Sequence, residues 1–208
     1  MKQSRPQTRR LPDPVRLALR RYFPSEVSAQ TAAYYTLPEH LALLRLRSEA
    51  ESRMLRWNDV ASEIAKELAD LDIRVTPCTA FSNSYMLEIL LHENIRFPER
   101  DEELFGLIKT APIRILKVAA SFLIPYWTAS FRNLRRRGGR IVVKQVPQQG
   151  RHSTRAVHAA GRVLKAHGWT RIPSSMAQTK IPNMDMQNIE SGEVRIADVV
   201  FGEQATRL

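Results

Sequence analysis

The sequence predicts a mainly α protein with a few short strands (α+β), with a helical N-terminal part and a winged-helix-like C-terminal part. The chain of 208 residues is 43% hydrophobic and has only eight glycines, which is enough apolar material for an ordinary core. Apolar residues recur at helical spacing over most of the first 135 positions. The β-branched runs that we assign to strands come after residue 140.

The first expected helix begins at residues 36–39, Thr-Leu-Pro-Glu, where the Thr-x-x-Glu spacing is that of a capping box and proline suits the first turn. Helical spacing then continues to about Asp72, as one long helix or two in line. The residues that carry this pattern are Leu41, Leu44, Leu55, Val60, Ile64, Leu68 and Leu71. A short helix carrying Met86, Ile89 and Leu90 should follow. The acids at 101–103 suit the positive end of another helix.

The longest periodic pattern predicts a core helix over residues 112–134. Its apolar members keep a spacing of three and four residues: Ile113, Leu116, Ala120, Leu123, Trp127, Phe131 and Leu134. Pro125 lies in the middle and should kink this helix, at a cost of about 3 kcal/mol. The basic residues 132–137 would form its last turn, and Gly138-Gly139 would end it.

The remaining elements have the order of the last helix and wing of a winged helix-turn-helix. A short strand is expected within 140–146, a helix over 153–167 with Gly168 at its C-cap, a strand start at 169–172, and a β-rich run over 193–201. In a winged helix-turn-helix the last helix lies in the major groove of DNA and the wing contacts the backbone. The sequence therefore indicates a DNA-binding unit in the C-terminal part.

The distribution of charge supports an anionic partner. The formal net charge is +11, and no Asp or Glu occurs from Leu104 through Met184, a stretch that contains 15 Lys and Arg. We divide the chain into a basic flexible arm (1–21), an acidic helical region (22–104) and a basic helical region with C-terminal strands (105–208). The arm is either an electrostatic tether or a solubilising tail. The acidic helices are candidates for a homodimer contact or a protein-partner contact.

Two groups of basic residues are candidates for contact with nucleic acid. On the 153–167 helix, spacings of three, four and three residues align Arg155, His158, Arg162 and Lys165 along one stripe. The second group consists of Arg135, Arg136, Arg137 and Arg140. It is a phosphate clamp, a binding site for an acidic partner, or simply the basic end of a helix. The full set of candidate binding residues is Arg135, Arg136, Arg137, Arg140, Arg155, Arg162 and Lys165.

The sequence offers little for catalysis. A single cysteine, Cys78, excludes an intrachain disulfide and a cysteine-built zinc site. His152, His158 and His167 match no metal-ligand spacing, and no glycine-rich phosphate loop is present. We therefore expect no catalytic residue, no metal and no cofactor. An enzyme that uses Cys78 is a third, weaker hypothesis.

These observations together favour a cytoplasmic protein that binds nucleic acid, DNA rather than RNA, in a regulatory or replication-accessory role. The most apolar run, residues 118–131, is 14 residues long and contains a proline, which is too short for a membrane span. The alternative is a non-enzymatic adaptor or subunit of a larger assembly that docks its basic half on an acidic protein or membrane surface.

Overall fold

The computed structural model describes residues 11–24, 27–78, 82–93, 95–98, 103, 106–108, 112–138, 140–184, 186, 188–190 and 192–202. The helices among them are α1 (Asp13–Tyr22), the 3-10 helix η1 (Ala32–Thr36), α2 (Pro38–Ser52), α3 (Met54–Glu67), α5 (Arg151–Ala166), α6 (Ser174–Ala177) and α7 (Ile196–Phe201). The strands are β1 (Asp72–Thr76), β2 (Ser84–Leu90), β3 (Ile113–Ser121), β4 (Tyr126–Arg137), β5 (Arg140–Val146) and β6 (Thr170–Arg171).

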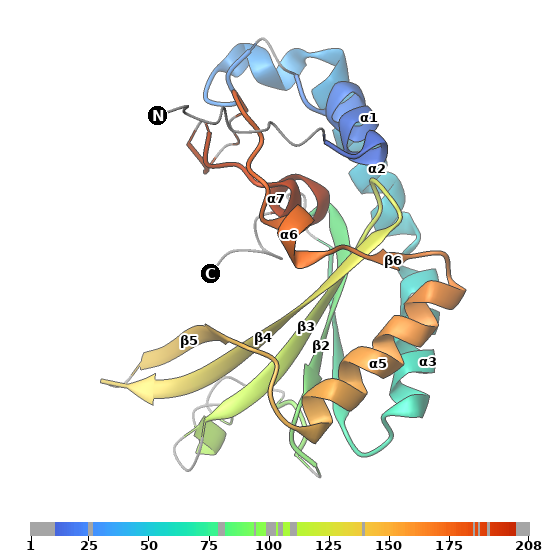
Figure 1. Ribbon diagram of the computed structural model, residues 1–208, viewed down its shortest axis with the longest axis vertical. Helices are drawn as coiled ribbons and strands as arrows, with labels where there is room; N and C mark the ends of the chain where they lie inside the picture. Colours follow the sequence, from blue (N-terminus) through green and yellow to red (C-terminus); the bar gives the residue numbers. More distant parts are fainter. Residues whose placement is uncertain are drawn as a thin grey trace, which may run out of the picture.

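One sheet organises these elements (Figure 1). Its strands follow the chain in the order β1-β2-β3-β4-β5, and every neighbouring pair is antiparallel. The two-residue strand β6 adds in parallel beside the start of β4. Because β2 pairs with β3, the acidic first half of the chain and the basic second half share this sheet.

Helices α3 and α5 lie side by side on one face of the sheet (Figure 1). Alternate side chains of a strand point to opposite faces, so every second residue of β2, β3 and β4 meets these helices. Leu116 and Val118 of β3 pack there against Trp57 and Ile64 of α3 and Leu164 of α5. This layer is the largest core of the described residues.

The opposite face of the sheet is covered in two separate places. Near the β3–β4 turn, Met86 and Ala119 pack in a cluster with residues of α1 and α7. Toward the other end of the strands, Leu90, Ile113 and Ile115 pack with residues of the 95–108 segment. Between these two apolar clusters the sheet carries the charged and polar row of Glu88, Lys117 and Ser130.

The mainly α fold class is wrong, because the expected core helix over 112–134 is the hairpin β3–β4. Pro125 lies in the turn between the two strands rather than at a helix kink. Eight of the nine residues of β3 are buried, since both faces of the sheet are covered there. A strand buried on both faces loses its alternation of apolar and polar residues, and periodicity alone then cannot separate it from a helix.

The expected helix around Met86 is also a strand, β2, in which six of seven residues are buried. The run at 193–201, expected to be β-rich, contains helix α7. The winged-helix arrangement is also wrong, because α5 packs on one face of a sheet whose strands β1 to β5 form an antiparallel meander. The expected helix at 101–103 lies mostly outside the described residues, although 106–108 are helical.

Several predicted elements are confirmed. The long N-terminal helical pattern forms two helices, α2 and α3, which meet at Arg53. The helix expected over 153–167 is α5, which starts two residues earlier, with Gly150 at its N-cap. The strands at 140–146 and 169–172 are β5 and β6.

The basic flexible arm expected over 1–21 is not among these confirmed elements. Residues 1–10 lie outside the described residues, and from Asp13 the chain forms helix α1, which runs to Tyr22.

Candidate nucleic-acid interface

The end of the β4–β5 hairpin carries the densest group of exposed cations among the described residues. Arg137 of β4 pairs in register with Arg140 of β5, so the hairpin turns between these two residues. Gly138 has φ +56°, in the left-handed region that glycine adopts without a steric penalty. The dipeptide expected to end a helix is thus a hairpin turn. We call the exposed residues Arg135, Arg136, Arg137, Arg140 and Lys144 the basic ribbon.

The hairpin register sorts the basic ribbon into two faces. Residues paired across antiparallel strands share a face, and successive residues alternate. The pairs Asn133–Lys144, Arg135–Val142 and Arg137–Arg140 therefore lie on one face of the hairpin. Arg136 and its partner Ile141 lie on the other. Four cations of the ribbon share the face on which α5 packs further along the sheet.

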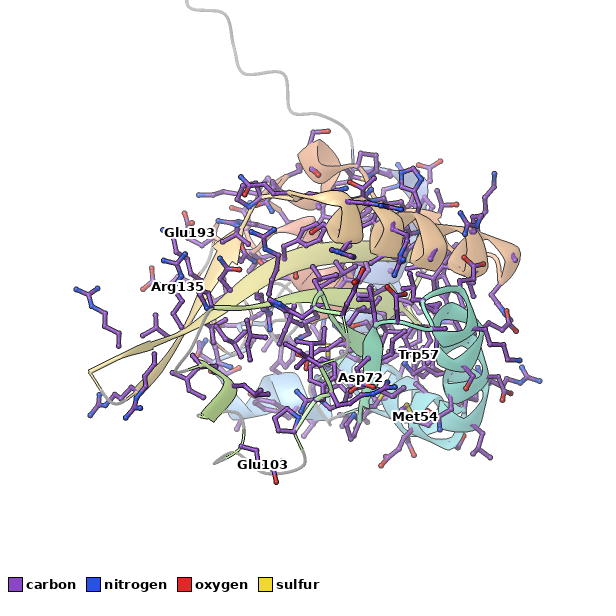
Figure 2. The ribbon with its side chains drawn as sticks, turned by 90° about the horizontal axis from the view of Figure 1, so that it is seen from below. Met54, Trp57, Asp72, Glu103, Arg135 and Glu193 are labelled. Atoms are coloured by element: carbon purple, nitrogen blue, oxygen red, sulfur yellow. The ribbon has the colours of Figure 1, made fainter. Side chains whose placement is uncertain are left out.

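The basic ribbon lies away from the helical layers. The β4–β5 hairpin extends outward from the sheet beyond α3 and α5 (Figure 1). Figure 2 shows Arg135 on the side of the molecule opposite Trp57 of α3. No residue of the ribbon forms an ion pair with a carboxylate from the described part of the chain. Within the described residues, no carboxylate therefore neutralises its charges.

The cations of α5 have a different environment. Arg155 pairs with Asp70 and Arg162 pairs with Glu67, and both carboxylates lie on or just after α3. The Arg155 guanidinium holds the pKa of the Asp70 carboxyl below its usual value, chiefly by hydrogen bonding. His167 Nε2 lies 3.0 Å from Glu63 Oε2 in the same row.

These contacts divide the predicted site residues into two sets. The α5 stripe faces carboxylates on and just after α3, and Arg155 and Arg162 form ion pairs with Asp70 and Glu67 there. Lys165, the third predicted member of the stripe, is exposed and forms no ion pair within the described residues. The structure brings together the four predicted arginines of the hairpin, and separates them from those of α5.

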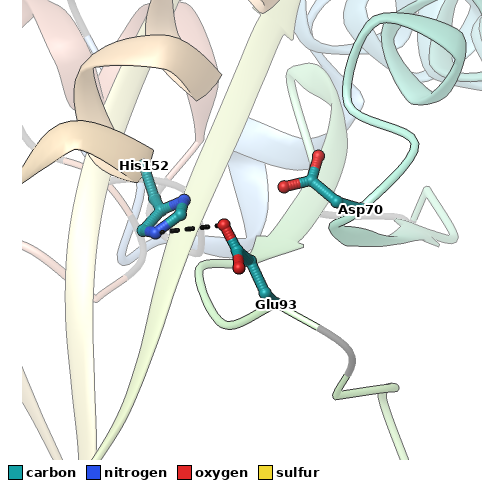
Figure 3. Close-up of side chains that lie close together, drawn as sticks. All are labelled: Asp70, Glu93 and His152. Atoms are coloured by element: carbon teal, nitrogen blue, oxygen red, sulfur yellow. Dashed lines mark ion pairs between the residues drawn. The ribbon is translucent and has the colours of Figure 1, made fainter.

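Three metal-ligating side chains converge near the start of α5 (Figure 3). Ligand atoms of Asp70, Glu93 and His152 lie within 4.8 Å of one another, and His152 Nε2 is 3.6 Å from Glu93 Oε1. Sequence reasoning missed this cluster because its acids come from segments far from His152 in the chain. A zinc ion binds its ligands at about 2.0–2.2 Å, and Arg155 already engages Asp70. We interpret the group as an ion-pair cluster.

Two buried cations lie on the sheet face opposite α3 and α5. The pKa of Lys117 is lowered to about 8, first by burial and then by the nearby Arg132, while Glu88 opposes this shift. The pKa of Arg132 is lowered as well, first by burial. Its Nε and Nη2 are buried without a hydrogen-bond partner in the described structure. The sheet thus has positive charge in its interior as well as on the ribbon.

The described helices include none with the length and hydropathy needed to cross a membrane. No protein family model, no curated protein and no solved structure matches this chain significantly.

Proposed function

We propose that this protein binds nucleic acid, with duplex DNA as its first candidate, through the basic ribbon. One observation carries the proposal: five exposed cations on a projecting two-stranded ribbon, none of which is paired with a carboxylate of the described chain. Contacts to phosphates by Lys and Arg supply most of the sequence-independent affinity of proteins for DNA. A regulatory or replication-accessory role remains the broader proposal.

The shape of the ribbon suits a groove of the duplex. The major groove of B-DNA is about 12 Å wide and admits a two-stranded β-ribbon as well as a helix. Arg135, Arg137, Arg140 and Lys144 share one face, which would lie toward one phosphate backbone, while Arg136 points from the other face. Arginine binds phosphate and guanine edges through paired N–H donors, so the ribbon can both hold the backbone and read bases.

The proposal changes the role of the α5 cations. Arg155 and Arg162 are engaged by Asp70 and Glu67, so their proposed role is to hold α5 against α3. Lys165 retains a proposed auxiliary contact with phosphate because it is exposed and has no carboxylate partner in the described part.

A charge-matched pair of triple variants tests this proposal. The ribbon variant is Arg135→Ala with Arg137→Ala and Arg140→Ala. The control variant is Arg20→Ala with Arg45→Ala and Lys66→Ala, which removes three exposed cations from helices α1, α2 and α3. Fluorescence anisotropy of a labelled 20-base-pair duplex at 50 mM salt should give at least a tenfold weaker affinity for the ribbon variant and less than a threefold change for the control. Equal losses in the two variants would contradict the site, since only total charge would then matter.

An acidic protein partner is the second candidate, favoured by the exposed edge of the ribbon. Val142 and Val143 of β5 are 44% and 39% exposed, and within the described residues β5 pairs only with β4. An unpaired edge can accept a strand from another chain. If the full chain co-purifies with an acidic protein after nuclease treatment, and Val143→Lys abolishes that complex while duplex DNA does not bind, this candidate replaces the first.

A further inference from the structure

A large cavity lies between the start of helix α3 and the β3–β4 turn. Trp57, one of its lining residues, lies on the side of the molecule opposite Arg135 of the basic ribbon (Figure 2). Its volume is about 670 Å³, within the range of about 300–1,000 Å³ that is common for small-molecule sites. Four separate segments line it: the start of α3, β2, the β3–β4 turn and the residues that follow α5. The lining residues that matter here are Arg53, Arg56, Trp57, Tyr85, Phe122 and Trp169. We call it the aromatic cavity.

The aromatic wall of this cavity is built as one contiguous set of rings. Trp57 stacks on Tyr85 with ring centroids 5.5 Å apart and planes 18° apart. Trp169 meets Trp57 edge-on at 6.2 Å, and Phe122 meets Tyr85 edge-on at 5.6 Å. Such contacts hold each ring in a fixed orientation. A planar ligand would therefore meet a preformed wall.

The indole N–H groups of Trp57 and Trp169 both donate hydrogen bonds within the protein. Trp57 Nε1 donates to the backbone oxygen of Met86 at 3.1 Å, and Trp169 Nε1 donates to that of Ser121 at 2.9 Å. These bonds fix the rings from behind. Trp57 is buried and supports the wall, while the half-buried Trp169 offers a ligand only its apolar surface.

Two arginines give the cavity a positive mouth. Arg53 and Arg56 are both exposed. Burial, and then the nearby Cys78, raise the pKa of the Tyr85 hydroxyl, and the charges of Arg53 and Arg56 partly oppose this rise. Arg56 has no carboxylate partner within the described residues, and Arg53 meets Glu49 only at 3.4 Å with both side chains 57% exposed. Asp59 is the one carboxylate among the described lining residues. The Tyr85 hydroxyl has no hydrogen-bond partner in the described structure.

From these contacts we infer that the aromatic cavity binds a small anion with an aromatic ring, of the mononucleotide class. The base packs against Trp169 and Phe122, which are half-buried and border the open space. The phosphate lies at the mouth between Arg53 and Arg56, where guanidinium groups bind it through paired N–H donors. The Tyr85 hydroxyl completes the polar end of the site. An aliphatic anion would leave the aromatic wall uncovered, and a neutral ring would leave the arginines without a partner.

Calorimetric titration of the full chain with four probes tests this inference: AMP, CMP, adenosine and inorganic phosphate. The two mononucleotides should bind at least ten times more tightly than adenosine or phosphate. They should also quench tryptophan fluorescence, because two of the three tryptophans line the cavity. Arg53→Gln with Arg56→Gln should weaken mononucleotide binding at least tenfold, whereas Lys66→Gln, elsewhere on α3, should change it less than twofold.

Two results would overturn the inference: no heat or quenching with either mononucleotide, or unchanged affinity in the double glutamine variant. Circular dichroism of that variant checks that it is folded, and Tyr85→Phe offers a milder change that keeps the ring. The triple ribbon variant should bind mononucleotides as the unmodified protein does. This site and the proposed DNA interface can therefore fail independently.

Discussion

Lys117 illustrates how a single residue in this fold departs from its ordinary chemistry. It is 7% exposed, in a row of the sheet between Glu88 and Ser130, and its pKa falls from 10.5 to about 8, with burial as the main cause. Below about pH 8 both the folded and the unfolded chain carry the proton, and the full cost of burying the charge is present. Above about pH 10.5 neither carries it, and that cost is absent.

Between these pH values the unfolded chain binds more protons at this position, so the contribution of Lys117 to the free energy of unfolding rises with pH. We expect the difference in this free energy between the unmodified protein and Lys117→Met to move in favour of the unmodified protein by up to about 3 kcal/mol from pH 7.5 to pH 10.5. Urea denaturation of both proteins across this range measures it. If the free energies of unfolding of the two proteins changed in parallel with pH, Lys117 would not be desolvated in the folded state.

At the scale of elements, helices with one solvated face were predictable and strands covered on both faces were not. Helices α3 and α5 each keep an apolar stripe and a charged stripe, so their helical spacing survives in the sequence. In β3, positions on both faces are buried, and a spacing of three and four between Ile113 and Leu134 arises by chance along two strands. Pro125 is the local signal that favours a β-hairpin over a single helix across 112–134, because proline suits a turn better than a helix interior.

The packing of α5 against α3 gives a prediction that distinguishes two roles of Arg155 and Arg162: contact with DNA, as expected from the sequence, and ion pairing between helices. If Arg155 and Arg162 served DNA, replacing both by alanine would weaken binding severalfold or more. Since Asp70 and Glu67 engage them, we instead expect Arg155→Ala with Arg162→Ala to lower the urea midpoint of unfolding. Duplex affinity should stay within threefold of that of the unmodified protein. Anisotropy and urea titrations of the same preparation measure both, and a tenfold loss of affinity at an unchanged midpoint would assign α5 to the interface.

At the scale of the whole molecule, folding pairs some cations of the second half with carboxylates of the first half and leaves the basic ribbon without a carboxylate partner among the described residues. The partners of Arg155, Arg162 and His167 lie 85, 95 and 104 residues away in the chain. No local pattern could reveal such pairs, so the sequence predicted a basic surface but could not say which helix or strand would carry it. The cluster at 135–140 was found because its arginines are contiguous, although its hairpin conformation was not.

The aromatic cavity lay beyond sequence analysis for the same reason. Trp57, Tyr85, Phe122 and Trp169 belong to four segments that meet only once the sheet is formed. Each ring taken alone fits a core position, and Trp57 is indeed 1% exposed. Only their arrangement around an open volume, with Arg53 and Arg56 at its mouth, distinguishes a binding wall from ordinary packing.

The dependence of duplex affinity on salt tests whether the basic ribbon binds DNA, because it counts the phosphates that the ribbon neutralises. A plot of log affinity against log salt concentration falls by about 0.9 per phosphate contact for B-DNA. Removing Arg135, Arg137 and Arg140 should make the slope shallower by up to about 2.7, while the control triple variant should keep the slope of the unmodified protein. Identical slopes for the ribbon variant and the unmodified protein would contradict the account.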